Sequence, residues 1–376
     1  MSAMSFSKLG AVAQYLRGIN FKPDDVVAVG TAGTVACMRT KNIQESLDCS
    51  DVWGVAETFV RRPEQILQEG DILVSSANSW NLVGKCCWIP ELPWKSTFGG
   101  FVSALRAKPN QVDPRFLYWW FSSDRTQALL RSFGQKTTSI SNLNSERCLN
   151  LDVPLPPLPD QRRIAAILDQ ADALRAKRRE ALAQLDSLTQ SIFIEMFGDI
   201  SISPKFNLGS IRAFVDANSG KSAKSVLSAE RTDIPIYGGN GINGWATNAL
   251  YEHPVLIFGR VGQQCGNAFM TEGSSWVTDN AIVVQISDSS KLNPVFVLHA
   301  FQGSNFSNRV KHLDLPFINQ GMILDNPIPI PPLIVQQTFA NRIQTVEALK
   351  VSHRASVTEL DILFASLQHR AFRGEL

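Results

Sequence analysis

The sequence predicts an α/β protein in which two similar mixed α/β domains alternate with two long helices. A proline-rich segment that leads into a long helical pattern occurs twice, at an offset of 175 positions. Short apolar runs separated by turn residues precede each copy in the same order. Such self-similarity is typical of a duplicated unit. We therefore expect domains at 1–150 and 200–323, each followed by a proline-rich segment and helix, at 151–199 and 324–376.

The first 150 residues have the pattern of several strands followed by a helix. Apolar runs that end in turn residues predict strands at 26–29, 72–74, 84–89 and 101–105. Pro114 suits the first turn of a helix, and the apolar residues after it predict one helix across 114–133. The polar stretch 134–144 is rich in hydroxyls and amides, which suit either a plain turn or contacts with phosphates and bases.

The proline-rich segment at 151–159 is expected to be extended, because proline fixes φ and has no amide donor. Asp160 is then the first good N-cap of a helix that runs to Phe197. Alternating spacings of three and four predict one apolar face made of Ile164, Ile167, Ala171, Leu174, Ala181, Leu185, Leu188 and Ile192, with Arg178 in the same series. A helix of about 38 residues spans roughly 57 Å, more than one small domain can cover.

The second copy repeats this arrangement at the C-terminus. Pro331, Pro332, Leu333, Gln336 and Ala340 match Pro156, Pro157, Leu158, Gln161 and Ala165. The corresponding helix face contains Phe339, Val346, Leu349, Leu360, Leu363 and Leu367, with Arg342, His353 and Ser356 in the same series. We expect the two helices to pair as an antiparallel coiled coil. Two other interpretations stay open: ordinary long helices of an α/β enzyme, or helices that associate with another copy of the chain.

Residues 200–323 repeat the order of the first domain at an offset near 180. Pro294, Phe296 and Phe301 match Pro114, Phe116 and Phe121. Three stretches carry the strongest local signal: the glycine-rich 234–245 and 258–266, and WVTDNAIVV at 276–284. Glycine lets a backbone approach a ligand, and the neighbouring Asn, Gln, Arg and Tyr side chains can read base edges. A hairpin without a ligand is the plain alternative. The repeat would place two similar binding surfaces around a pseudo-twofold axis.

Composition excludes several classes of protein. Hydrophobic residues make up 44% of the chain, enough for packed cores in two domains. The six cysteines form no CxxC pair and have no histidines at ligand spacing, so we expect neither a disulfide framework nor a zinc site. Without a signal-peptide pattern or a long apolar stretch, the expected location is the cytoplasm. The net charge of +2 comes from residues outside the helices, which suits either domains that face a polyanion or an ordinary charged surface.

Some familiar motifs lack the context that their chemistry needs. Gly239, Gly241 and Gly244 match GxGxxG, but no helical pattern follows, so a dinucleotide site is not expected. Lys221 ends a stretch like a phosphate-binding loop, but Val215 stands where its first glycine belongs. The five histidines are scattered without a triad-like setting. The sequence therefore predicts no catalytic residue and no metal ligand.

Further motifs accompany the repeated order of domain, proline-rich segment and helix. They are RTKNIQ at 39–44, PLPPLPDQRRIA at 154–165, LRAKRR at 174–179, YGGNGINGW at 237–245, GRVGQQCG at 259–266 and TDNA at 278–281. Together they resemble the specificity subunit of Type I restriction-modification systems, over essentially the whole chain. The resemblance implies two target recognition domains, each reading one half of a split double-stranded DNA sequence. It also implies that the paired helices set the spacing and dock two methyltransferase subunits.

The resemblance implies no cofactor in this chain. S-adenosylmethionine would bind the methyltransferase, and ATP and Mg²⁺ would serve the restriction and translocase subunits. Contacts with DNA are expected from Lys22, Arg39, Lys85, Lys136, Thr137, Thr138, Ser139, Lys221, Tyr237, Asn240, Asn243, Trp245, Arg260, Gln263, Asn280 and Asn319. Contacts with the partner are expected from Leu174, Arg178, Leu185, Leu188, Leu349, Leu360 and Leu363. The alternative is an enzyme that binds a nucleotide or sugar on the GGNGING loop at 238–244.

Overall fold

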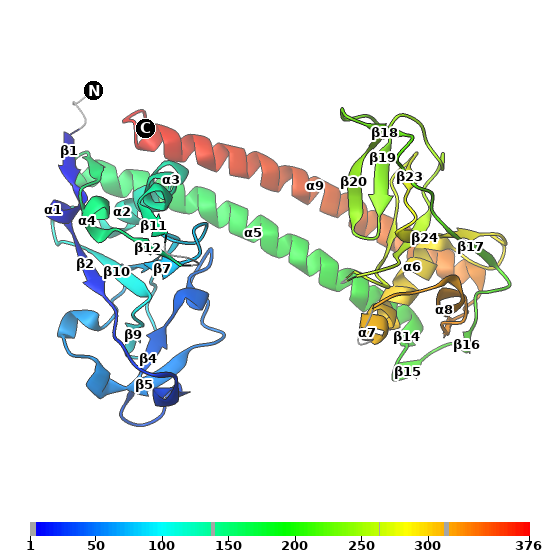
Figure 1. Ribbon diagram of the computed structural model, residues 1–376, viewed down its shortest axis with the longest axis horizontal. Coiled ribbons are helices and arrows are strands. Elements are labelled where there is room, and N and C mark those ends of the chain that lie inside the picture. Colours follow the sequence, from blue (N-terminus) through cyan, green and yellow to red (C-terminus); the bar gives the residue numbers. More distant parts are fainter. Residues whose placement is uncertain (1–4, 137–139, 263, 312–315) are drawn as a thin grey trace. The chain divides into compact units, whose positions relative to one another are not determined.

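A computed structural model describes residues 5–136, 140–262, 264–311 and 316–376 of the chain (Figure 1). The chain forms two compact units, Met1–Lys177 with Val357–Leu376, and Arg178–Ser356. Each unit contains one globular domain and one part of each long helix. The division therefore cuts both helices, whereas the boundaries expected from the sequence lie at the helix ends and stay predictions.

The first unit contains two four-stranded sheets. One has the antiparallel order β2-β10-β6-β8, with strands at Ala13–Arg17, Val102–Ala107, Ile72–Ser75 and Cys86–Trp88. The other has the order β3-β5-β4-β9, at Val27–Ala28, Trp53–Ala56, Thr34–Met38 and Ser96–Phe98, and its β4 and β9 are parallel. All four predicted strands are thus present. Strand β3 has two residues and β8 has three, so both are shorter than the strands predicted at 26–29 and 84–89.

Smaller elements complete this domain. Strands β11, β12 and β7 form a sheet from Gly134–Lys136, Ser141–Leu143 and Ala77–Asn78, and β1 (Ser5–Lys8) pairs with β13 (Asp152–Leu155). The helices are α1 (Leu9–Val12), α2 (Pro114–Phe121), α3 (Asp124–Ser132) and α4 (Ser145–Leu149). The single helix expected at 114–133 is therefore two helices. The side chain of Ser123 accepts the backbone N–H of Thr126 and starts α3 afresh.

The second unit repeats this topology strand for strand. Its antiparallel sheet has the order β17-β24-β21-β22, at Val215–Ser219, Ala281–Ile286, Leu256–Gly259 and Ala268–Met270. Its other sheet has the order β18-β20-β19-β23, at Leu227–Ser228, Gly241–Ala246, Pro235–Gly238 and Trp276–Val277, again with a parallel pair, β19 and β23. The predicted internal repeat is confirmed by this shared strand order.

The remaining elements of the second unit follow the same plan. Strand β16 (Leu208–Gly209) pairs with β25 (Ile328–Pro329), as β1 does with β13, and β14 (Gly198–Asp199) pairs with β15 (Ser203–Pro204). The helices are α6 (Pro294–Gly303), α7 (Phe306–Lys311) and α8 (Gln320–Leu324).

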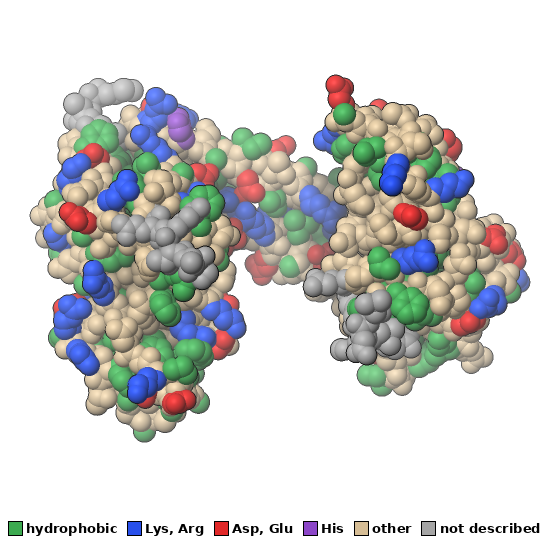
Figure 2. Space-filling model, in the orientation of Figure 1, with side chains coloured by type: hydrophobic (Ala, Val, Ile, Leu, Met, Phe, Trp, Pro, Cys, Tyr) green, Lys and Arg blue, Asp and Glu red, His purple; other side chains and the backbone are tan. Residues whose placement is uncertain are grey.

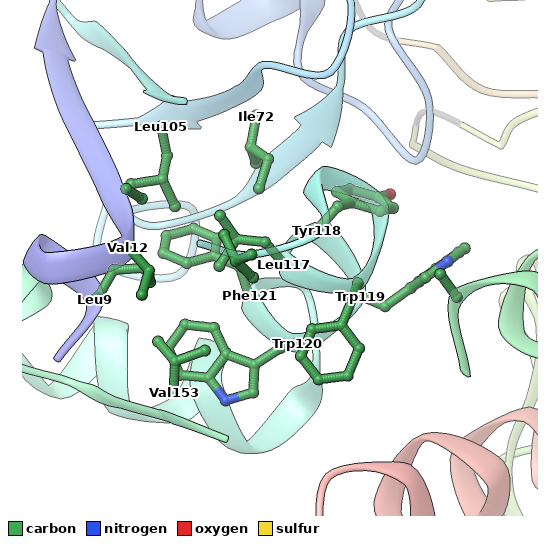
Figure 3. Packing of buried hydrophobic residues seen from close by; sticks show 14 of the residues in the cluster. Leu9, Val12, Ile72, Leu105, Leu117, Tyr118, Trp119, Trp120, Phe121 and Val153 are labelled. Atoms are coloured by element: carbon green, nitrogen blue, oxygen red, sulfur yellow. The ribbon is translucent and has the colours of Figure 1, made fainter. Parts of the chain in front are cut away.

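The core of the first unit is built on α2, which has the side chain of Asp113 as its N-cap and Pro114 in its first turn. Figure 3 shows Leu117, Tyr118, Trp119, Trp120 and Phe121 of α2 gathered with Leu9, Val12, Ile72, Leu105 and Val153. Every residue from Phe116 to Phe121 is buried, since one face of α2 packs on the sheet and the opposite face packs on the long helices. The domain is thereby fixed to its own part of the helix pair.

The two long helices are α5 (Leu158–Phe197) and α9 (Leu333–Ala371). Helix α5 begins two residues before the predicted N-cap Asp160, because Pro159 can occupy a first helical turn, where no N–H bond is lost. Within the first unit, Arg175 of α5 bonds Asp361 of α9 at 2.6 Å. Within the second unit, Lys350 of α9 bonds Asp186 of α5 at 2.9 Å. In each unit the helices run antiparallel, as predicted.

Only part of the apolar face predicted for α5 and α9 is buried in the structure. Four of its leucines are exposed by 44–54%: Leu174, Leu188, Leu349 and Leu363. The side chains that fill the interior instead include Leu168, Phe193 and Phe197 of α5, and Ile343, Phe364 and Gln368 of α9. The reason is that the helices also pack on the domains. The buried stripe therefore turns toward α2 or α6 and leaves the four leucines on the surface.

Two glutamines make the same joint between helix and domain. Gln161 Oε1 accepts the backbone N–H of Asp113 at 2.8 Å, and its Nε2 donates to Pro156 O at 2.8 Å. Gln336 Oε1 accepts the backbone N–H of Asn293 at 2.9 Å, and its Nε2 donates to the matching proline carbonyl at 2.9 Å. Both glutamines are buried, and Asp113 and Asn293 cap α2 and α6. The glutamine of the repeated motif thus ties each proline-rich segment to its domain.

Candidate nucleic-acid interface

Three connections meet at one edge of the first domain. Lys85 Nζ donates to Gln44 Oε1 at 2.8 Å, which joins the β4–β5 connection to the β6–β8 connection. The backbone N–H groups of Ser76 and Ala77 donate to Phe101 O at 3.0 and 3.2 Å, which adds the β9–β10 turn. Strand β7 of the β6–β8 connection also pairs with β12, at the end of the polar stretch predicted from the sequence. These connections form a continuous surface of loops.

The second domain has the same edge, built from the equivalent connections. The backbone N–H of Arg260 donates to Asn280 O at 3.0 Å, joining the β21–β22 and β23–β24 connections. Ile318 N–H donates to Arg260 O at 2.9 Å, which brings in the stretch before α8. A Cβ on Gly239, in the β19–β20 turn, would lie 3.1 Å from Asn280 O, and one on Gly259 would lie 2.7 Å from Gly239 O. The glycines let these loops pack on one another.

The RTKNIQ stretch occupies the place that YGGNG has in the second domain. Met38 O accepts the N–H of Gly99 at 2.9 Å, and Tyr237 O accepts the N–H of Thr278 at 2.8 Å. Both bonds extend a parallel pair, β4 with β9 and β19 with β23. The following residues, 39–44 and 238–240, therefore begin equivalent connections. The sequence alone shows no YGGNG in the first domain and gives no hint of this equivalence.

Asn240, Arg260 and Asn280 lie exposed on these neighbouring connections of the second domain, as the prediction requires. Asn243 is exposed on β20, and its side chain lies so close to Gly238 that a Cβ there would meet Asn243 Nδ2 at 2.3 Å. Trp245 is half-buried further along β20, under the guanidinium of Arg231 at 4.8 Å from the ring centroid. Three amides and one guanidinium therefore face solvent at one edge, a set suited to base edges and phosphates.

Two residues of the second domain that were predicted to contact DNA make contacts within the protein. Tyr237 is 5% exposed, packs near Phe269 and accepts the backbone N–H of Glu272 at its hydroxyl, 3.1 Å away. This differs from the prediction because β19 is buried on both faces, with Tyr237 in one apolar cluster and Ile236 in another. Asn319 Oδ1 accepts the N–H of Met322 at 2.9 Å and caps α8. Its acceptor is thus engaged in starting a helix.

In the first domain, Arg39 supports the loop instead of extending from it. Its guanidinium lies 3.5 Å from the Trp53 ring centroid and pairs with Asp51 at 3.0 Å. Hydrogen bonds from Lys41 and Arg39 lower the pKa of Asp51, which keeps this carboxylate charged. Buried Asn42 closes the loop by donating to Asp51 O at 3.0 Å. This differs from the predicted phosphate contact, since the guanidinium is engaged inside the protein.

Sequence reasoning missed the side chains that the loop does present. Lys41 is exposed although its Nζ pairs with Asp51 at 2.7 Å. Gln44 is also exposed; its Nε2 donates to Lys41 O at 2.7 Å, and its Oε1 accepts from Lys85. A shallow depression beside them is lined by Thr40, Lys41, Ile43, Gln44, Ser75, Asn78, Leu82 and Lys85. Lys22 is exposed on the connection between β2 and β3. The side chain of Lys136, and Thr137, Thr138, Ser139 and Gln263, lie outside the described residues.

The GGNGING loop is a hairpin. Gly238 pairs with Gly241, and β20 follows at once, so the helix that a dinucleotide phosphate would need is replaced by a strand. Among residues 5–136, 140–262, 264–311 and 316–376, no group of three or more His, Cys, Asp or Glu side chains could hold a metal ion. Nor is any helix within these ranges both long and apolar enough to cross a membrane.

Positive charge is distributed over both domains. Figure 2 shows Lys and Arg side chains spread over the visible face of each domain, with Asp and Glu among them. Lys221 is exposed, and its backbone N–H donates to Val277 O at 2.9 Å, which places it beside the β23–β24 connection. Such isolated lysines suit contacts with phosphates, which carry no sequence information.

Replacing Lys221 by alanine is expected to lower specific and non-specific DNA affinity alike. One lost phosphate contact should reduce the slope of log affinity against log salt by about one unit. The measurement is binding to target and random duplexes over a salt series. Lys291→Ala is the matched control, because Lys291 is exposed beyond the opposite end of β24. A changed base preference with an unchanged slope would show that Lys221 reads bases.

Comparison with known proteins assigns the fold and the family. The family model described as "Type I restriction modification DNA specificity domain" matches residues 5–184 and 205–358, one match for each half of the repeat. The StySPI specificity subunit of Salmonella potsdam is 20% identical, over 98% of this chain and 88% of its own length. The EcoKI specificity subunit of Escherichia coli strain K12 is 25% identical, over 49% of this chain and only 40% of its own length.

A solved structure shares the fold at low sequence identity. The crystal structure of the S subunit of a Type I restriction-modification system from M. genitalium superposes with a TM-score of 0.66 and 14% identity, covering 99% of this chain and 97% of that one. The family match spans most of both domains and helices, and the strand order of both domains agrees with an internal repeat. This chain therefore belongs to the family of Type I restriction-modification DNA specificity subunits.

Proposed function

We propose that this chain reads a bipartite DNA target, one half-site with each domain. The observation that carries the proposal is the repeated loop edge: equivalent connections gather on both domains through equivalent backbone bonds, but they present different side chains. Two domains with the same backbone arrangement but different loop side chains are suited to two half-sites of different sequence. Amides of Asn240, Asn243 and Asn280 would bond base edges, while Lys221, Lys85 and Arg260 would contact phosphates.

The helices would dock two methyltransferase subunits. Leu174 and Leu349 occupy matching positions of the repeat and are 54% and 48% exposed. Leu188 and Leu363 also match and are 44% and 48% exposed. Apolar side chains repeated on the surface of both copies support two equivalent contacts with one kind of partner. Leu185 and Leu360 are half-buried, and Arg178 lies 3.4 Å from His353, so these residues would stabilise the pair beneath that surface.

The chain itself would contribute recognition, with the chemistry on its partners. S-adenosylmethionine would bind the methyltransferase, and ATP and Mg²⁺ would serve restriction and translocase subunits. The match to a DNA specificity domain and the edge loops, which offer hydrogen-bonding groups for DNA, support the recognition role proposed for this chain. A DNA-reading subunit with reduced cysteines would act in the cytoplasm.

Replacing Asn240 and Asn243 by alanine tests the two-half-site proposal. Each lost bidentate contact is expected to weaken binding of one half-site by about 1–3 kcal/mol and to leave the other half-site unchanged. The measurement is affinity for duplexes mutated in either half-site. Asn248→Ala is the control, because Asn248 is an exposed amide beyond the other end of β20.

Equal losses at both half-sites would contradict independent reading. Stabilisation against thermal unfolding by nucleotides or sugars, without stabilisation by duplex DNA, would instead favour an enzyme that uses the GGNGING loop.

A further inference from the structure

Phe101 is held at the loop edge of the first domain with its ring in solvent. The side chain is 65% exposed, between β9 and β10. Its carbonyl accepts the N–H groups of Ser76 and Ala77, and the N–H of Val102 donates to Gly99 O at 2.9 Å. Phe101 belongs to none of the apolar clusters that the described residues form. Three hydrogen bonds therefore fix the backbone of this turn, while the ring contributes to no core.

The equivalent residue in the second domain is Asn280. Its carbonyl accepts the N–H of Arg260 at 3.0 Å, and the N–H of Ala281 donates to Thr278 O at 3.1 Å. The same turn thus closes with the same bonds before the matching strands, β10 and β24. One domain presents a phenyl ring at this place and the other presents an amide. An amide can bond a base edge, but a phenyl ring needs an apolar partner.

We propose that Phe101 is a specificity-determining residue that reads the methyl group of a thymine in the half-site of the first domain. This inference rests on the proposed function. In the major groove the apolar feature of a base pair is the thymine C5-methyl, which phenylalanine can contact. Stacking on a base would be the other use of the ring, but paired bases keep their faces covered, and extruding one costs energy. The methyl contact needs no distortion of the duplex.

Deoxyuridine tests the contact at the level of one methyl group. The target is first selected from a random duplex library with the full-length chain and its methyltransferase. Each thymine of the first half-site is then replaced in turn by deoxyuridine. One replacement is expected to lower wild-type affinity about fourfold, the value for one buried methyl-sized group. The same replacement should leave the affinity of Phe101→Ala unchanged, since that variant has already lost the contact.

Two further variants make the test specific. Phe101→Leu keeps an apolar side chain and should keep part of the response to deoxyuridine. Asn280→Ala, at the equivalent turn of the other domain, should keep all of it. The wild-type measurements require no substitution in the protein, so misfolding of Phe101→Ala, checked by thermal melting, would not remove the test.

Three results would overturn the proposal. They are a first half-site without an A·T pair, no thymine at which deoxyuridine lowers wild-type affinity, and equal responses of wild type and Phe101→Ala. A loss of affinity in Phe101→Ala without any response to deoxyuridine would identify stacking instead. Failure of the wild-type complex to select any sequence would defeat the proposed function itself, a result distinct from specific binding that ignores the methyl group.

Discussion

Phe339→Ala is expected to lower the free energy of unfolding of the second unit by about 3–5 kcal/mol. Phe339 of α9 is fully buried, with its ring centroid 5.3 Å from that of Phe197 and 5.6 Å from that of Phe193 in α5. It also faces Phe296 of α6 at 6.5 Å. Truncation would leave a cavity where two long helices and the domain meet, and close-packed neighbours can fill it only in part.

Denaturant unfolding followed by circular dichroism measures this loss. Leu349→Ala is the matched control, because Leu349 lies on the same helix but is 48% exposed. Its removal should change the stability by about 0.5 kcal/mol or less. A loss below about 1 kcal/mol in Phe339→Ala would mean that the aromatic cluster does not hold the helices on the domain.

Lengthening both long helices is expected to change the distance between the half-sites. Four residues inserted after Ala181 in α5 and four after Val351 in α9 leave two contacts intact, Arg178 with His353 on one side and Asp186 with Lys350 on the other. Four helical residues add about 6 Å. Base pairs are spaced by about 3.4 Å, so the preferred spacer should lengthen by one or two base pairs, with both half-site sequences unchanged.

Methylation of a target library with variable spacers measures the optimum. The insertion also turns each helix by about 40° beyond a full turn, so some loss of affinity is expected along with the shift. Four residues inserted at Gly273 are the control, because Gly273 lies in an exposed loop between β22 and β23 and a longer loop leaves the helices unchanged. An unchanged spacer in a folded, methylating helix variant would show that the helices do not set the spacing.

Local rules of chain geometry made the architecture predictable. Prolines limited where the long helices could start, and the repeated glutamine motif indicated the duplication that the sheets confirm. The same rules failed where tertiary packing decides. Leu174 fits a three-four spacing, but the buried stripe of α5 turns toward α2 instead, with Leu168 in the interior. Only the neighbouring domain determines that turn.

The loop edge could be predicted in its glycines and amides, but not in its geometry. Asn240 and Arg260 were recognisable because they flank glycines, and Asn280 because it lies in the TDNA motif, and the structure brings all three to one edge. Phe101 follows Gly99 and Gly100, but its phenyl side chain has no hydrogen-bonding group that would indicate a contact with DNA. Its equivalence to Asn280 depends on backbone bonds between strands, and these bonds are independent of the side chains they align. Tyr237 was misplaced because β19 is packed on both faces, which the glycines and polar residues around it do not indicate.

The joints made by Gln161 and Gln336 determine which parts of the chain can be exchanged. Each glutamine holds the domain through a backbone N–H, that of Asp113 or Asn293, a group that any residue other than proline supplies. Each glutamine also donates to a proline carbonyl of the helical half, and Gln336 donates in addition to the backbone carbonyl of Lys291 in the domain. A foreign domain with the same turn before its first helix could therefore be fitted to this frame. Such a graft would give the complex a new target and leave its other subunits undisturbed.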